Sequence, residues 1–71
     1  MKSAELADRL ERARRSVAEG ETHIQLQRDL LFRLDAAGDD TSKARVLLEI
    51  LLKRQAERLR NLAHAMRQSP T

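Results

Sequence analysis

The chain has 71 residues, of which 41% are apolar and 35% are charged, and its net charge is +3. It contains no cysteine and a single aromatic residue, Phe32, which excludes a disulfide framework and leaves few bulky side chains for an enclosed core. A chain of this size without disulfides usually needs a metal or self-association to fold stably. We therefore expect one domain over residues 1–71 that associates with itself, or with another helical protein.

Targeting and membrane signals are not expected in this chain. Residues 1–18 carry charges throughout and contain no apolar segment typical of a secretory signal. The longest apolar runs, 46–48 and 50–52, are separated by Glu49, so no segment is long enough to span a bilayer. The lack of cysteine suits a reducing compartment. The sequence therefore predicts a cytoplasmic protein.

The first predicted element is a long helix. From Leu6 to Leu34, apolar and small residues recur at alternating spacings of three and four, a heptad pattern typical of a helix that packs along one side. We expect Ser3 to be its N-cap. Gly38 offers the left-handed conformation that commonly ends a helix. These signals predict a helix over about residues 3–37.

The second predicted element is a helix with the same heptad spacing. Several residues that can cap a helix follow Gly38, and we expect Thr41 to be the cap. We expect Pro70 to stop the helix, because proline cannot continue it. The sequence therefore predicts an all-α antiparallel hairpin with helices at about 3–37 and 42–68, in the manner of a short coiled coil.

Folding the chain back at the turn pairs the two heptad stripes layer by layer. In this pairing Gln27 faces Gln55, the one polar residue in the centre of each stripe, and a hydrogen bond between them would define the register. A polar ligand site at this layer is the alternative. The predicted seam consists of Val17, Gly20, Ile24, Gln27, Leu31, Leu34, Leu48, Leu52, Gln55, Leu59, Leu62 and Met66.

Gly20 is the weak point of the first predicted helix, because glycine inside a helix costs about 1 kcal/mol relative to alanine. One interpretation is that its missing side chain lets Leu62 approach the backbone closely. The other is a kink or short break at residues 18–21.

Apolar residues also lie outside the stripes in the half of the hairpin near the turn. At about 100° per residue, Leu26 and Leu30 flank the first stripe, and Val46 and Ile50 lie nearly opposite the second. Helices that are apolar on most sides are buried, so we expect a two-fold homodimer of hairpins that forms a four-helix bundle. The predicted oligomer interface consists of Leu26, Leu30, Phe32, Val46, Leu47, Ile50 and Leu51.

Charge is distributed unevenly along the chain. The net charge is +2 over residues 1–18, −3 over 19–49 and +4 over 50–71, so the hairpin is basic at its open end and acidic at its turn. A basic cluster can bind the phosphates of nucleic acid. A solvated surface with ion pairs between neighbours, such as Glu11 with Arg15, explains the same charges. The candidate anion or nucleic-acid patch consists of Arg9, Arg12, Arg15, Arg54, Arg58, Arg60 and Arg67.

Catalytic and metal-binding motifs are not apparent. His23 and His64 are the only side chains that ordinarily titrate near neutral pH, and they lie at different levels of the predicted hairpin without metal-ligand spacing. The sequence contains no Ser/His/Asp arrangement and no glycine-rich phosphate loop. We therefore expect a protein that is not an enzyme and that uses no metal or cofactor.

Two runs of residues carry a resemblance to a known group. The first consists of Gly20, Glu21, His23, Ile24 and Gln27, and the second of Leu34, Gly38, Asp40, Thr41, Ala44, Leu47 and Leu48. Together they resemble short bacterial proteins with the pattern GExHIxxQ, then L, then GxDTxxAxxLL, over roughly residues 20–48. That group has no established activity, so the resemblance implies a helical hairpin of unknown function. The segment 52–65 departs from the group's usual continuation.

A second resemblance is one of topology. The dimeric helical hairpin of sensor histidine kinases presents a phospho-accepting histidine on its first helix, where His23 lies here. Ile24 follows it in place of the usual acidic or polar residue, and no proline follows downstream as it does in those proteins. The sequence thus favours a structural or regulatory protein–protein interaction module, with nucleic-acid binding and histidine phosphotransfer through His23 as alternatives.

Overall fold

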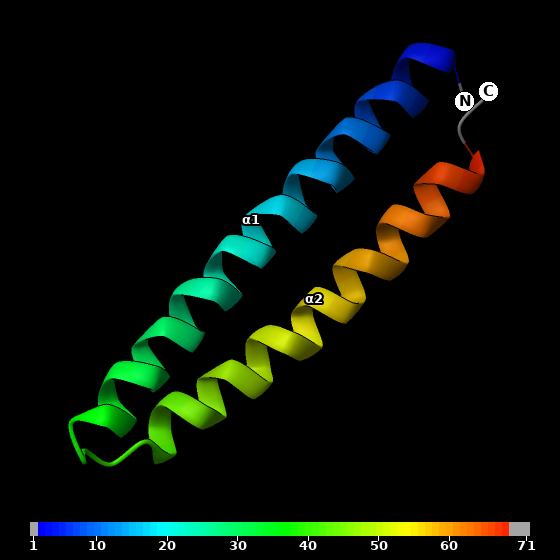
Figure 1. The fold of residues 1–71 in the computed structure, drawn as a ribbon. Helices are drawn as coiled ribbons and strands as arrows, with labels where there is room; N and C mark the ends of the chain where they lie inside the picture. The colour runs from blue at the N-terminus through cyan, green and yellow to red at the C-terminus, as the bar shows by residue number, and fades with distance from the viewer. Residues whose placement is uncertain (1, 69–71) are drawn as a thin grey trace.

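The computed structural model describes residues 2–68 and shows two antiparallel helices (Figure 1). Helix α1 spans Ser3–Ala36 and α2 spans Ser42–Gln68, joined by a short turn. The start of α1 and the end of α2 lie together at one end of the molecule. The predicted hairpin is confirmed, with α1 ending one residue earlier than expected. Pro70, the expected stop, lies outside the described residues.

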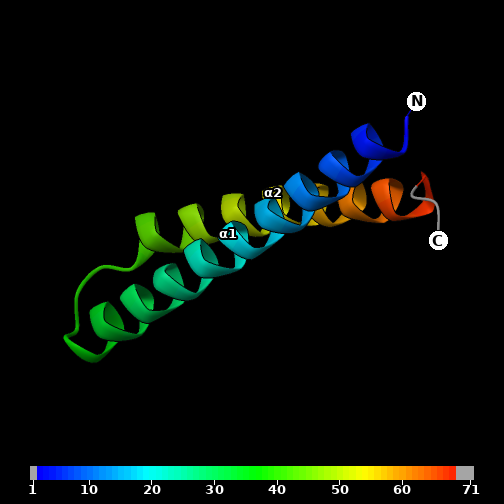
Figure 2. The ribbon, with the colours of Figure 1, turned by 90° about the horizontal axis from the view of Figure 1, so that it is seen from above.

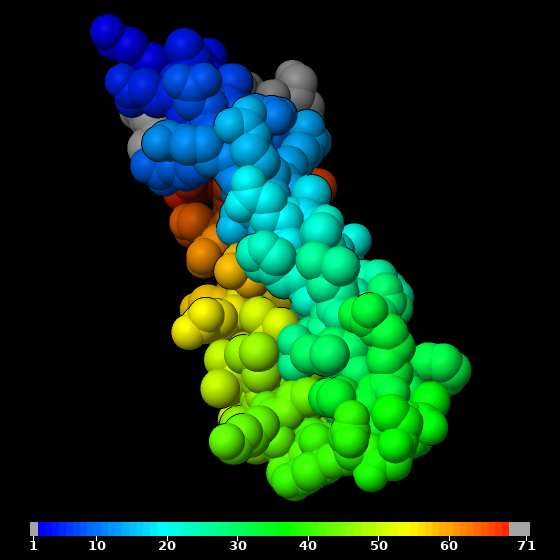
Figure 3. All heavy atoms as spheres, turned by 90° about the vertical axis from the view of Figure 1, so that its left-hand side faces the viewer, coloured from blue at the N-terminus to red at the C-terminus, as the bar shows by residue number. Residues whose placement is uncertain are grey.

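The hairpin is a narrow rod with principal extents of 54 × 14 × 14 Å. The two helices cross at a shallow angle, as Figure 2 shows from above, in keeping with coiled-coil-like packing. In the space-filling view α1 lies in front of α2 and packs against it (Figure 3). Each helix therefore has one side covered by the other, and its remaining sides face outward.

The C-terminus of α1 forms a Schellman motif. The Asp39 N–H donates to the Leu34 carbonyl at 2.9 Å, and the Gly38 N–H donates to the Asp35 carbonyl at 3.1 Å. Gly38 has a φ of 75°, which glycine adopts without steric cost. The expected role of Gly38 is confirmed.

The N-terminus of α1 differs from expectation. Ser3 is already helical, and Lys2 takes the N-cap position without a side-chain cap. The Lys2 carbonyl accepts the Leu6 N–H at 3.1 Å, which closes the first turn. The prediction that Ser3 caps this helix is therefore wrong, because the helix extends one residue further back.

The cap of α2 is shared between two residues. The Thr41 carbonyl accepts the Arg45 N–H at 2.9 Å, so Thr41 holds the N-cap position of the backbone as expected. The capping side chain, however, is Asp40, whose Oδ1 accepts the Ser42 N–H at 3.0 Å and the Ser42 hydroxyl at 2.6 Å. These two hydrogen bonds lower the pKa of Asp40 below its ordinary value of 3.8, the bond from the hydroxyl contributing most.

The seam of α1 is the predicted one. Every position of the heptad pattern is buried or half-buried, which confirms the expected stripe. Its members are Leu6, Leu10, Ala13, Val17, Gly20, Ile24, Gln27, Leu31 and Leu34.

The seam of α2 is only partly the predicted one. Leu48, Gln55 and Leu62 lie in it, but Leu52, Leu59 and Met66 are 40%, 48% and 54% exposed, so their assignment to the seam is wrong. Leu48, Gln55 and Leu62 form a line shared by two heptad stripes, one flanked by Leu52, Leu59 and Met66 and the other by Ala44, Leu51, Arg58 and Ala65. The helix turns the second flank to α1, with Ala44 and Ala65 buried near its two ends. The observed seam consists of Thr41, Ala44, Leu48, Leu51, Gln55, Arg58, Leu62 and Ala65.

The register also differs from the predicted layers. Gln27 and Gln55 do not bond to each other: Gln27 Nε2 donates to the Ala44 carbonyl, and Gln55 Nε2 donates to the Val17 carbonyl, each at 2.9 Å. Gly20 faces Gln55, one heptad away from the expected Leu62. Each glutamine lies beside a small residue, Ala44 or Gly20, that leaves room to reach the opposite main chain.

Candidate interaction surfaces

The interior of the hairpin is thin. Among the described residues, the buried apolar side chains are Ala44 and Ala65, and the buried polar ones are Gln27 and Gln55 at 8% and 6% exposed. Large apolar side chains remain exposed over much of the rod, which is unusual for a chain that functions alone. They are Leu26, Leu30, Phe32, Val46, Leu47, Ile50, Leu52, Leu59 and Met66.

A polar contact lies in the middle of the seam. A Cβ placed on Gly20 would overlap Gln55 Oε1 and would lie 3.0 Å from Arg58 Nη1. Helix α1 continues through Gly20 without the break at residues 18–21. Gly20 does allow a close approach, but Gln55 makes it in place of the expected Leu62. Gln27 Nε2 and Gln55 Nε2 each donate to the opposite helix, whereas Gln55 Oε1 and Arg58 Nη1 are buried beside Gly20 without a hydrogen-bond partner in the part of the chain that the structure describes. The two glutamine hydrogen bonds thus join one helix to the other.

Four exposed leucine and isoleucine side chains gather on one side of the hairpin near the turn. Leu26 and Leu30 flank the seam of α1, at 60% and 37% exposed, and Leu47 and Ile50 flank that of α2, at 45% and 41%. We call these four residues the turn-half patch.

A hydrogen bond near the open end shows that the two flanks are on the same side. The Arg9 Nη1 donates to Gln68 Oε1 at 3.4 Å across the seam. Arg9 lies three heptads before Leu30 on α1, so the two residues lie on the same flank of that helix. Gln68 lies three heptads after Leu47 on α2, so these two also share a flank. Leu30 and Leu47 therefore project on one side of the rod.

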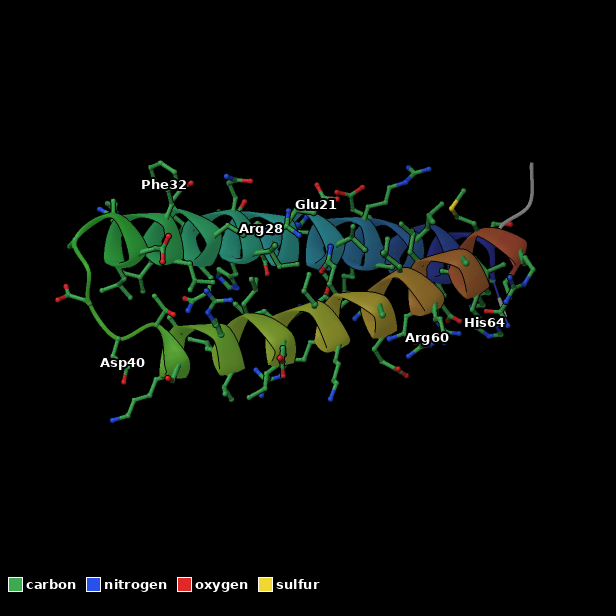
Figure 4. All side chains as sticks on the ribbon, turned by 60° about the horizontal axis from the view of Figure 1, so that its bottom comes forward. Glu21, Arg28, Phe32, Asp40, Arg60 and His64 are labelled. Atoms are coloured by element: carbon green, nitrogen blue, oxygen red, sulfur yellow. The ribbon has the colours of Figure 1, made fainter. Side chains whose placement is uncertain are left out.

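The other predicted interface residues are not part of the turn-half patch. Phe32 is 77% exposed and points away from α2 (Figure 4), and it lines a hollow together with Leu26. Val46 is 56% exposed, and its helical position is nearly opposite the seam. Leu51 is half-buried in the seam of the hairpin itself, on the side of α2 that faces α1.

A second exposed apolar surface runs along α2 on the opposite flank. It consists of Leu52, Ala56, Leu59, Ala63 and Met66, all exposed, and we call it the α2 stripe. Its Leu52 end borders a shallow hollow of about 540 Å³ between the helices. The lining residues of this hollow on α1 include Ala18, Glu21, Gln25 and Arg28.

The seven predicted basic residues do not form one patch. Arg58 is half-buried and lies beside Gly20 in the seam. Arg15 pairs with Glu11 at 3.6 Å, and Arg60 pairs with Glu57 on the side of α2 away from α1 (Figure 4). Arg9, Arg12, Arg54 and Arg67 are exposed. The arginines thus point in several directions, which disfavours a continuous phosphate-binding surface.

The two histidines are both exposed. His64 lies on the outer side of α2 (Figure 4), while His23 is on α1, so they do not converge. Within residues 2–68, no three potential metal-ligating side chains come together. In the same part of the chain, neither helix has a stretch apolar enough to cross a membrane.

Sequence reasoning missed five seam residues of α2, which are Thr41, Ala44, Leu51, Arg58 and Ala65. Alanine gives a weak periodic signal and arginine gives an opposing one, so Leu52, Leu59 and Met66 dominated the pattern. The 3–4 spacing from Thr41 to Ala65 was the signal that could have found them. Comparisons with protein-family models, curated proteins and solved structures find no match for this chain.

Proposed function

We propose that this hairpin is a non-enzymatic protein–protein interaction module that pairs with a second copy of itself through the turn-half patch. Two hairpins joined in this way form a four-helix bundle. The observation that carries the proposal is the amount of exposed surface. The chain exposes 5581 Å², whereas a compact monomer of its mass exposes about 4,500 Å². The difference of roughly 1,000 Å² is close to the surface that each partner buries in a standard interface, about 800 Å².

The chemistry of the turn-half patch suits a copy of itself. Four aliphatic side chains from both helices give it an apolar centre, as homodimer interfaces have. Asp29 and Arg33 lie beside Leu26 at its border, and a two-fold axis brings both signs of charge to each side of the contact. Opposite charges can then pair at the rim without like charges being forced together.

The test compares substitutions on the two exposed surfaces. Leu26→Asp and Ile50→Asp each place a carboxylate in the turn-half patch, and we expect both to convert a dimer to a helical monomer of lower stability. Leu59→Asp is the matched control, because Leu59 is similarly exposed but lies in the α2 stripe. We expect it to remain dimeric. Mass is measured by light scattering, and helix content by circular dichroism.

The outcomes separate the proposal from its rivals. A dimer that survives both Leu26→Asp and Ile50→Asp contradicts the assigned interface. If instead Leu59→Asp alone gives monomers, the copies meet through the α2 stripe.

A further inference from the structure

We infer that the α2 stripe is a second docking surface, and that it binds an amphipathic helix with acidic border residues from another protein. This inference does not depend on the homodimer proposed above. The turn-half patch and the α2 stripe lie on opposite flanks of the α2 seam, so a partner on one leaves the other accessible.

The spacing of the α2 stripe is that of a coiled-coil contact. Its five residues follow one another at intervals of four, three, four and three. They cover about 21 Å of helix at about 1.5 Å per residue. A partner helix of four turns can therefore follow the whole stripe.

The shape of the stripe also fits a helix. Leucine or methionine alternates with alanine along it, so that large side chains stand beside small ones. Alanine positions leave holes into which a partner's leucines can insert, as facing helices require. Leu59 at 48% exposed and Met66 at 54% keep much of their apolar surface in water in the isolated hairpin. A bound helix would remove that surface from water.

Charge at the border indicates the kind of helix. Lys53, Arg60 and Arg67 recur every seven residues one position beyond Leu52, Leu59 and Met66, so they line the outer edge of the stripe. The single acidic residue between residues 50 and 68 is Glu57, and it pairs with Arg60. A partner with glutamate or aspartate along the facing edge complements this row.

The inner border, toward α1, is balanced in charge. Glu21 and Arg28 both line the hollow beside Leu52. This inner border therefore favours neither an acidic nor a basic partner. The basic outer row determines that the partner's border residues are acidic.

A second copy of this chain fits the stripe less well. Residues 50–68 carry five basic residues and one acidic residue. Two such segments packed on each other would bring like charges together along the contact, which is unfavourable. The charge thus favours a different protein over a second copy.

The test uses two synthetic helical peptides of identical apolar pattern. Both carry leucines at heptad spacing, and one has glutamate at the border positions where the other has lysine. We expect the wild-type chain to bind the glutamate peptide at least about tenfold more tightly, measured by fluorescence anisotropy. Raising salt from about 50 mM to about 500 mM should narrow this difference, because salt screens exposed charges.

Variants locate the binding and control for folding. Leu59→Asp should weaken binding of the glutamate peptide at least about tenfold, whereas Leu26→Asp should leave it unchanged. The combined Lys53→Glu, Arg60→Glu and Arg67→Glu variant should prefer the lysine peptide. Circular dichroism verifies that each variant stays helical.

Three results would overturn the inference. These are failure of both peptides to bind, equal binding of the two peptides, and loss of binding in Leu26→Asp while Leu59→Asp still binds. Self-association that Leu59→Asp abolishes would show that the stripe takes a second copy instead.

Discussion

At the scale of single residues, Gly20 has a role that helix propensity alone would not assign. Alanine is a better helix former than glycine by about 1 kcal/mol, but a Cβ here would overlap Gln55 Oε1. Gln55 is 6% exposed and donates to the Val17 carbonyl. It can make room only by weakening that bond, and an unsatisfied buried polar group costs about 1–3 kcal/mol.

The effect of Gly20→Ala should therefore depend on Gln55. In the wild-type chain we expect Gly20→Ala to lower the free energy of unfolding by roughly 1 kcal/mol, because the clash outweighs the propensity gain. In a Gln55→Ala background the same change should raise it by roughly 1 kcal/mol. Urea denaturation of the four proteins measures this double-mutant cycle. An effect of the same sign in both backgrounds would contradict the assigned contact.

Asp40 links the α2 cap to pH. Hydrogen bonds from the Ser42 hydroxyl and N–H hold the pKa of Asp40 below 3.8 in the folded chain. A group with a lowered folded-state pKa stabilises the fold above its ordinary pKa, and that stabilisation is lost as the pH falls through the folded-state value.

Asp40→Asn provides a cap that does not titrate, because asparagine is also a good N-cap. We expect the wild type to lose stability relative to Asp40→Asn as the pH is lowered from about 7 to below about 3, measured by thermal melts. Asp39→Ala removes the neighbouring carboxylate but keeps Asp40. We expect this variant to lose stability at low pH relative to Asp40→Asn, as the wild type does. Parallel pH curves for wild type and Asp40→Asn would show that the cap does not contribute.

At the scale of the helices, α1 could be predicted from sequence almost completely and α2 only in part. Every stripe position of α1 was assigned correctly, because its other flanks carry few large apolar residues over most of its length. The α2 helix has two overlapping stripes that share Leu48, Gln55 and Leu62. The more hydrophobic stripe contains Leu52, so a sequence pattern places it against α1. Close packing of the two helices instead favours the stripe that contains Ala44 and Ala65. Composition alone does not distinguish them.

Two adjacent leucines test which stripe is inside. Leu51 is half-buried in the seam, whereas Leu52 is 40% exposed. We expect Leu51→Ala to lower the free energy of unfolding by about 2 kcal/mol and Leu52→Ala by less than about 1 kcal/mol, since the loss follows the apolar surface buried. Urea denaturation of the two variants measures the difference. A larger loss of stability in Leu52→Ala than in Leu51→Ala would show that the seam expected from sequence is the correct one.

At the scale of the whole molecule, the sequence predicted that apolar side chains lie outside the seam, but it did not predict where all of them lie. A short chain without cysteines and with apolar residues on several helix sides indicated association, and the exposed surface of the rod supports that argument. The α2 stripe was missed as an external surface because its leucines had been assigned to the seam. Phe32 and Val46, at 77% and 56% exposed, also lie outside the seam.

The charge polarity of the rod follows directly from the chain turning back on itself. Residues 19–49, around the turn, carry a net charge of −3, while both outer segments are positive. The basic border of the α2 stripe is part of the positive end. Its three members recur at heptad spacing, so they lie on one side of α2.

Sedimentation equilibrium of the wild-type chain measures most directly whether the exposed apolar side chains near the turn are covered by a second copy. The mass of one chain is 8.1 kDa. We expect a mass of about twice that value, with dissociation on dilution to a helical monomer of lower stability, because a two-helix rod buries little surface by itself. A mass of 8.1 kDa at every concentration, with the helices intact, would contradict the proposed homodimer.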